Sequence, residues 1–195
     1  MKKLLTIGLI VVVAIVLYRL FAGTYNNLVT EQQKVESQWA QVENVYQRRA
    51  DLIPNLVNTV KGYADFEQET LTRVIEARAK ATSITVDADD LTPEKVAEFQ
   101  AAQSELSTAL GRLLVSVERY PDLKANQNFL DLQTQLEGTE NRIAVERMKF
   151  NETVRSYNTY VKTFPRNLLA GMYGFEERGY FDASPEAEQV PQVQF

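Results

Sequence analysis

The chain has 195 residues and a formal net charge of −5, and it contains neither histidine nor cysteine. The lack of histidine removes the commonest general base and zinc ligand, and the lack of cysteine removes thiol nucleophiles, disulfides and iron–sulfur ligation. The sequence has no glycine-rich phosphate loop, no G-x-S-x-G elbow and no concentrated basic surface. The composition therefore predicts a protein that is not an enzyme, holds no cofactor or metal, and binds no nucleic acid.

An apolar run near the N-terminus is the strongest single signal in the chain. It covers residues 4–22. At 1.5 Å of rise per residue, about twenty helical residues cross a hydrocarbon core of about 30 Å. We therefore predict a transmembrane anchor over residues 1–23, with Tyr18 and Arg19 at the far membrane interface. A cleaved secretory signal is the alternative, and the large and charged residues near Ala22 fit a cleavage site poorly.

The charges that flank this anchor predict its orientation. Lys2, Lys3 and the α-amine stand on the short side, whereas the long side carries Arg19 and then no basic residue before Lys34. Positively charged flanks stay preferentially in the cytoplasm. We therefore expect the N-terminus in the cytoplasm and the main domain outside it.

Residues 24–165 predict an all-α fold, in which the transmembrane helix continues into an antiparallel up-and-down bundle of about four long helices. Only 8 glycines and 6 prolines occur in the chain, which argues against many short strands and tight turns. Residues at alternating steps of four and three, most of them apolar, form a stripe on the first helix: Leu28, Gln32, Val35, Trp39, Val42, Tyr46, Arg49 and Ile53. Because proline disfavours helical geometry in the preceding residue, we expect this helix to end near residues 51–53 and the second helix to run from Pro54 to about Ala81.

The third and fourth helices are indicated by a cap and by a repeat. Thr92, Pro93 and Glu94 supply a hydroxyl cap, a proline at the first helical position and an acid in the first turn. The fourth helix has a large apolar or aromatic residue at every seventh position: Phe129, Leu136, Ile143, Phe150, Tyr157 and Phe164. Such a repeat indicates either a coiled coil with another chain or one seam of an antiparallel bundle, and the two are not exclusive.

The composition changes after Pro165. Residues 166–181 are rich in aromatic and apolar side chains, and the returning fourth helix is expected to bring them to the bilayer. The predicted membrane-interface residues in this segment are Arg166, Leu168, Leu169, Tyr173, Phe175, Tyr180 and Phe181. Alternatively, these side chains cap the base of the bundle. Residues 182–195 predict a flexible acidic tail.

Several motifs occur in the order and spacing of one known family. The most specific is R-R-A-D-L-I-P-N-L at residues 48–56, and the second half adds Y-P-D-L-K-A-N at residues 120–126 and Y-N at residues 157–158. From about Tyr25 to Phe181 the chain resembles the LemA family. The resemblance implies a single-pass bacterial membrane protein with a long helical bundle, and it delivers no activity. Members are found beside a membrane metalloprotease gene, and a relative takes part in building magnetosome membranes.

Polar residues of these motifs lie where a core is expected, and buried charges are costly unless they are paired. In an antiparallel pairing of the first and fourth helices, Asp51 and Asn55 approach residues 124–126. Arg48 or Arg49 then comes within reach of acids on the fourth helix. The predicted network consists of Arg48, Arg49, Asp51, Asn55, Arg78, Glu140, Arg147 and Asn151. It is either a ligand or partner site at the membrane-distal tip or a device that fixes helix register.

These expectations together predict a membrane-anchored helical scaffold of the bacterial envelope that self-associates and organises membrane or partner proteins. The alternative is an adaptor that regulates a membrane protease or a signalling protein. The expected contacts are the lipid bilayer, further copies of the chain and a membrane-protein partner. The expected location is the bacterial inner membrane, with the main domain on the periplasmic or extracytoplasmic side.

Overall fold

One helix of 60 residues, α1 (Lys2–Lys61), dominates the computed structural model, which describes residues 2–62 and 67–182. The helices that follow are α2 (Gln68–Ser83), α3 (Pro93–Val117), α4 (Pro121–Lys124), α5 (Gln127–Lys162) and α6 (Arg166–Tyr173). No strand occurs within these described ranges, and the predicted all-α fold with four long helices is confirmed. Of the predicted flexible tail, residues 183–195 lie outside the described residues.

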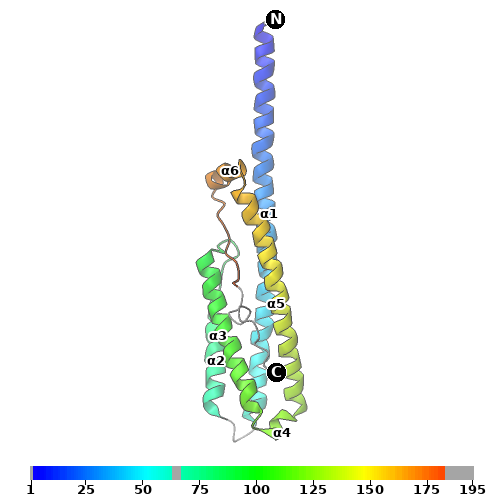
Figure 1. Cartoon of the computed structure of the whole chain (residues 1–195), viewed down its shortest axis with the longest axis vertical. Helices are drawn as coiled ribbons and strands as arrows, with labels where there is room; N and C mark the ends of the chain where they lie inside the picture. Colours follow the sequence, from blue (N-terminus) through cyan, green and yellow to red (C-terminus); the bar gives the residue numbers. More distant parts are fainter. Residues whose placement is uncertain (1, 63–66, 183–195) are drawn as a thin grey trace, which may run out of the picture.

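The N-terminal part of α1 projects alone beyond the bundle (Figure 1). The large apolar side chains described there are exposed along the whole stretch; Leu4 near its start is 74% exposed and Leu20 near its end is 60% exposed. Within the described chain, α1 is the one helix that is long and apolar enough to cross a membrane, and none of its apolar stretch is buried in the protein. The stretch is therefore free to contact lipid. Gly23 does not interrupt the helix, which passes from this stretch directly into the bundle.

The expected end of the first helix near Pro54 is wrong, because α1 continues to Lys61. A proline inside a helix has no N–H for the carbonyl four residues earlier. Here that carbonyl belongs to Ala50, and it accepts a hydrogen bond of 2.8 Å from Nε of Arg78 on α2. An arginine of the neighbouring helix thus replaces the missing donor. The chain reverses instead between Lys61 and Gln68, so the buried Leu56, Val57 and Val60 belong to α1.

Helices α2 and α3 form a hairpin that packs beside α1 (Figure 1). The predicted start of α3 is confirmed, since Thr92 lies at its N-cap and accepts from the backbone N–H of Lys95, with Pro93 at the first position. The short α4 then turns the chain, and Asn126 caps α5 by accepting from the backbone N–H of Phe129 at 3.1 Å. These caps satisfy N–H groups that the first helical turn leaves free.

Helix α5 returns antiparallel to α1 along most of the length of the bundle (Figure 1). The first five members of its seven-residue repeat, from Phe129 to Tyr157, are buried, and so are the apolar members of the stripe on α1. Phe164, the last member, is 76% exposed. The repeat is therefore a seam inside one chain. Its buried members leave no surface for a coiled coil with another copy.

The segment after α5 divides into two parts. Helix α6 lies beside α1 at the end of the bundle from which the apolar part of α1 projects (Figure 1). Gly174 follows with φ of 77°, a left-handed conformation that glycine adopts without strain. Residues 175–182, here called the strap, then run in extended form back along the bundle, away from α6.

Candidate functional site: a buried arginine and a pinned strap

Arg49 lies in the middle of the bundle with 1% of its surface exposed. One of its terminal nitrogens, Nη1, donates to the hydroxyl of Ser107 at 2.6 Å and to the carboxylate of Glu140 at 2.8 Å. The other, Nη2, donates to the side-chain and backbone oxygens of Gln103, at 2.7 and 3.1 Å. The buried charge thus has both a counter-ion and hydrogen bonds, as burial requires. We call Arg49, Gln103, Ser107 and Glu140 the Arg49 layer.

The Arg49 layer connects all four long helices. Arg49 comes from α1, Glu140 from α5 and Gln103 from α3, and the amide of Gln103 donates to the carbonyl of Ala81 on α2 at 3.1 Å. The layer also lies between two hydrophobic clusters. One contains Trp39 and Phe150, and the other contains Ile53 and Leu136. A slip of α5 by one turn would bury Arg49 against apolar side chains, so the layer favours this register of the helices.

Three residues of the predicted network are exposed and take no part in this layer. Arg48, Asp51 and Asn55 are exposed on α1, and the carboxylate of Asp51 accepts from Gln47 on the same helix at 2.8 Å. The expected approach of Asp51 and Asn55 to residues 124–126 rested on a turn near Pro54. Because α1 continues past that point, the start of α5 lies beside a later part of α1, and Lys124 pairs instead with Glu118.

Asn151 and Asn158, seven residues apart on α5, hold the strap by its backbone. The amide of Asn151 donates to the carbonyl of Phe181 at 2.8 Å and accepts from the N–H of the same residue at 2.9 Å. Asn158 makes the same pair of bonds with Arg178, both at 2.9 Å. A carboxamide offers one donor side and one acceptor side, which matches the N–H and C=O of an extended residue.

Further contacts fix the strap on both sides. The hydroxyl of Tyr157 donates to the carbonyl of Glu176 at 2.9 Å, and burial raises the pKa of this hydroxyl above the ordinary tyrosine value while nearby Arg178 opposes the rise. The N–H of Gly179 donates to the carbonyl of Leu91 at 2.8 Å. A Cβ at Gly179 would lie 2.7 Å from Cα of Pro93, so only glycine fits this close approach.

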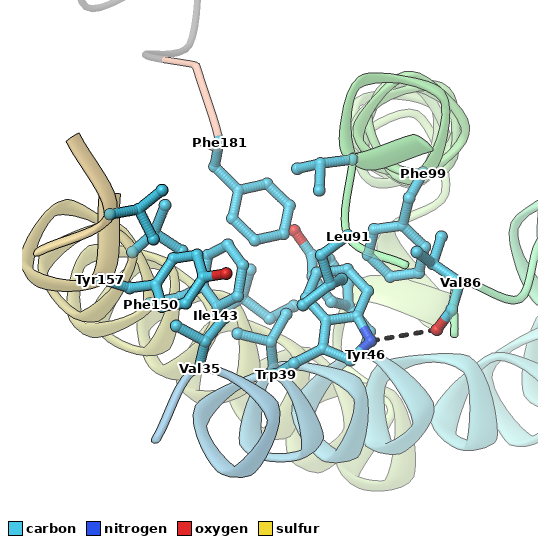
Figure 2. Packing of buried hydrophobic residues seen from close by; sticks show 14 of the residues in the cluster. Val35, Trp39, Tyr46, Val86, Leu91, Phe99, Ile143, Phe150, Tyr157 and Phe181 are labelled. Carbon is cyan, nitrogen blue, oxygen red and sulfur yellow. Dashed lines mark hydrogen bonds between the residues drawn. The ribbon is translucent and has the colours of Figure 1, made fainter. Parts of the chain in front are cut away.

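Phe181 ends the strap inside an aromatic cluster (Figure 2). Its ring stacks on Trp39 with 5.9 Å between centroids, and it contacts the ring of Phe150 at 5.4 Å. The indole N–H of Trp39 donates to the carbonyl of Val86 at 3.3 Å. Phe181 is 3% exposed, so its expected place at the membrane interface is wrong. Arg147 of the predicted network covers its ring at 5.0 Å and donates to the carbonyl of Asp182 at 2.7 Å.

The strap itself was not expected from the sequence. Its signal was the recurrence of asparagine at residues 151 and 158, at the same seven-residue spacing as the buried seam of α5. Asparagine at two such positions indicates side chains that need hydrogen-bond partners beside the seam. Asn158, which is buried, belongs with Asn151 in the site and was absent from the predicted network.

The other predicted interface residues are distributed over α1, α6 and the strap. Tyr18 and Arg19 are exposed on the projecting part of α1, and Arg166 and Leu168 are exposed on α6. Leu169 on α6 and Phe175 at the start of the strap are half-buried, and the ring of Tyr173 on α6 contacts that of Tyr25 on α1 at 5.0 Å. Tyr180 is exposed and belongs to the strap.

Comparison with known proteins places these features in a family. A family model described as LemA family matches residues 38–195, which include the Arg49 layer and the strap. Protein LemA of Metamycoplasma hominis is 27% identical over 187 residues, covering 96% of this chain and 78% of that protein. Magnetosome protein MamQ of Magnetospirillum gryphiswaldense is 26% identical over 193 residues, covering 87% and 70%. Magnetosome protein MamQ 2 of Paramagnetospirillum magneticum is 27% identical over 185 residues, covering 84% and 66%.

Proposed function

The chain belongs to the LemA family, and from this premise we propose that it is a non-enzymatic, membrane-anchored scaffold that self-associates and organises membrane or partner proteins of the bacterial envelope. One observation carries the proposal. A single helix, α1, supplies both the apolar stretch that can enter a membrane and the central element of the bundle. The bundle is therefore a stiff body held at a set height above a bilayer.

The buried polar groups support a structural role for the bundle. Arg49 forms hydrogen bonds with residues of α3 and α5, and Asn151 and Asn158 form hydrogen bonds with the strap. These groups join one part of the chain to another. Their geometry favours holding a shape over transforming a substrate.

Self-association requires a surface outside the buried seam. Helix α5 exposes Val145 and Met148, one turn apart, at 43% and 65%. Residues three apart on a helix share a face, so this pair forms an apolar spot on the outside of the bundle. We assign the contact between copies to this spot together with the exposed apolar stretch of α1.

Light scattering of the full chain in detergent micelles tests this proposal. We expect a mass above one protein per micelle, and we expect Val145→Glu combined with Met148→Glu to lower it. Val115→Glu is the matched control, because Val115 is a 73% exposed apolar residue on α3. A strictly monomeric wild-type chain would contradict self-association.

The orientation with the N-terminus in the cytoplasm is also part of the proposal. The charges that support it are Lys2 and Lys3 before the apolar stretch and Arg19 near its end. Because the chain has no cysteine, a single Asn128→Cys variant can be treated in intact cells with a membrane-impermeant thiol reagent. Asn128 is exposed at the start of α5. Labelling in intact cells is expected, and labelling only after lysis would contradict the orientation.

A further inference from the structure

Helix α6 carries an apolar face that stays exposed in the described part of the chain. Leu168 and Met172 lie one turn apart on this helix, at 65% and 63% exposure, and Phe164, in the turn that leads into α6, is 76% exposed. The opposite side of α6 is fixed to the bundle, since Ala170 is 1% exposed and belongs to the cluster that contains Trp39. A contiguous group of large apolar side chains with this exposure marks an interaction surface.

This face lies at the level where the apolar stretch of α1 ends. The ring of Tyr173 on α6 contacts the ring of Tyr25 on α1, with 5.0 Å between centroids. Tyr25 follows Ala22, the last residue of the apolar run, by about 4.5 Å along the helix axis. The headgroup layer on each side of a bilayer is about 5–7 Å thick. A bilayer that holds the apolar stretch of α1 therefore has its headgroups at the height of α6.

We propose that α6 is an interfacial membrane helix, and that Phe164, Leu168 and Met172 enter the boundary between the headgroups and acyl chains of the bilayer that α1 spans. Continuity favours lipid as the occupant, because this face extends the exposed apolar surface that α1 carries as far as Phe21 at 41% exposure. Helices that lie in a membrane interface have such an apolar face beside cationic and aromatic residues.

The residues beside this face have the matching chemistry. Arg166 is exposed, and its guanidinium lies 4.3 Å from the ring centroid of Tyr160. An arginine held over an aromatic ring at headgroup height can donate to lipid phosphate while its stem stays on apolar surface. The proposal rests on the membrane anchoring of the proposed function and adds a second contact. Two contacts with one bilayer fix the rotation of the bundle about α1.

Site-specific fluorescence in lipid vesicles tests this assignment, because the chain has no cysteine of its own. Leu168→Cys and Met172→Cys are each labelled with a polarity-sensitive dye in the full chain, in vesicles of phosphatidylcholine and phosphatidylglycerol. Ile10→Cys in the apolar stretch of α1 is the lipid reference, and Val115→Cys on α3 is the exposed reference. We expect the dyes at positions 168 and 172 to show blue-shifted emission, quenching by a lipid-borne quencher and protection from aqueous iodide, as we expect for the reference dye at position 10. The dye at 115 should show the reverse.

Each other outcome overturns the proposal in a distinguishable way. Iodide quenching at 168 and 172 together with lipid quenching at 10 rejects the interfacial helix and leaves the anchor intact. Iodide quenching at 10 rejects the anchor as well. Protection at 168 that disappears when the protein is diluted with lipid shows that a second copy covers the face.

A substitution provides an independent check. Leu168→Gln combined with Met172→Gln should decrease lipid quenching of a dye at Phe164→Cys. Because both side chains are exposed, thermal unfolding should stay unchanged. Undiminished lipid quenching in this variant would contradict the proposal.

Discussion

Arg49 and Arg78 both face the inside of the bundle, and each meets a different physical need. Arg49 is a buried charge whose hydrogen-bond partners come from α3 and α5. Arg78 is a donor for a carbonyl that Pro54 leaves without its helical partner. The sequence predicted that Arg48 or Arg49 comes within reach of an acid of the last long helix, because a charge where a core is expected requires a counter-ion. The structure shows that Arg49 makes this contact. It did not predict the role of Arg78, because a missing donor on one helix does not say which neighbour replaces it.

Substitution of Arg49 tests the Arg49 layer. Arg49→Ala should lower the free energy of unfolding by about 3 kcal/mol, since it removes a buried side chain and leaves the side-chain oxygen of Gln103 without its donor. The value stays at the low end because the Glu140 side chain is 43% exposed and can turn to water. Arg48→Ala, at the exposed neighbour, should change it by less than about 0.5 kcal/mol. Thermal unfolding followed by circular dichroism measures both, and equal effects would refute the layer.

Tyr157 should make the stability of the protein sensitive to alkali. Burial raises the pKa of its hydroxyl above the ordinary value of 10.0, so the unfolded chain ionises first as pH rises. The contribution of the neutral Tyr157 hydroxyl to stability is therefore fully present below pH 10.0. It is lost as the pH rises through the higher pKa of the folded state, by about 1.4 kcal/mol for each unit of difference between the two pKa values.

The Tyr157→Phe variant isolates this effect. It loses the bond to Glu176, so it should be less stable than wild type by about 1 kcal/mol near neutral pH. The difference should shrink above pH 10.0, because phenylalanine has no proton to lose. Urea unfolding across this pH range measures both trends. A difference that stays constant with pH would show that burial of this hydroxyl has no effect on alkaline stability.

At the scale of elements, the sequence predicted helix faces well and chain reversals poorly. The stripe on α1 and the seam of α5 are buried as their spacing indicated, because apolar periodicity reports directly which face a helix buries. The end of α1 was misplaced because the proline rule assumes that the broken hydrogen bond stays broken. The strap was missed because an extended segment has no periodicity, and its contacts use backbone groups that every sequence has.

A double-mutant cycle tests why α1 continues through Pro54. Arg78→Met should destabilise the wild-type chain by about 1.5 to 3 kcal/mol, because the carbonyl of Ala50 loses a charged donor. In a Pro54→Ala background the new N–H at position 54 can donate to that carbonyl, so Arg78→Met should matter less. We expect a coupling energy of about 1 kcal/mol or more between the two sites. Additive effects would mean that the Arg78 bond does not compensate for the proline.

The attachment of the strap can be tested through Asn158. Asn158→Leu leaves the N–H and C=O of Arg178 without partners and should destabilise the protein by about 2 kcal/mol. Hydrogen exchange should speed up at the amides of residues 176–182 more than in the rest of the bundle. Asn141→Leu is the matched control, because Asn141 is exposed on the same helix. Unchanged exchange in the strap would show that Asn158 does not hold it.

At the scale of the whole molecule, the arrangement of the helices sets the height of the protein above a membrane. Since α1 has no break between Ala22 and Lys61, the far end of the bundle lies about 58 Å beyond the apolar run. Helix α5 returns along this length and brings α6 back beside α1. The general plan was predictable from the apolar helix faces, whereas the height was not, because the first helix was expected to end near Pro54 and α1 continues to Lys61.

Energy transfer from the bilayer surface measures this height. A donor dye at Asn128→Cys, near the distal end, and acceptor dyes on lipid headgroups should report a closest approach of about 60 Å for an upright bundle. A dye at Asn26→Cys, beside the end of the apolar run, should report strong transfer and serves as the control. Equal transfer from both positions would mean that the bundle lies flat on the bilayer.

The unbroken course of α1 also makes the molecule a lever. With no joint between lipid and bundle, a change in the inclination of the spanning stretch is carried undiminished to the opposite end. Spanning helices commonly incline by about 20°, and on a rigid arm of about 58 Å such a change sweeps the far end sideways by about 20 Å. Thinning or thickening of the bilayer would thereby displace the far end of the bundle far enough to change its contacts with a neighbouring protein.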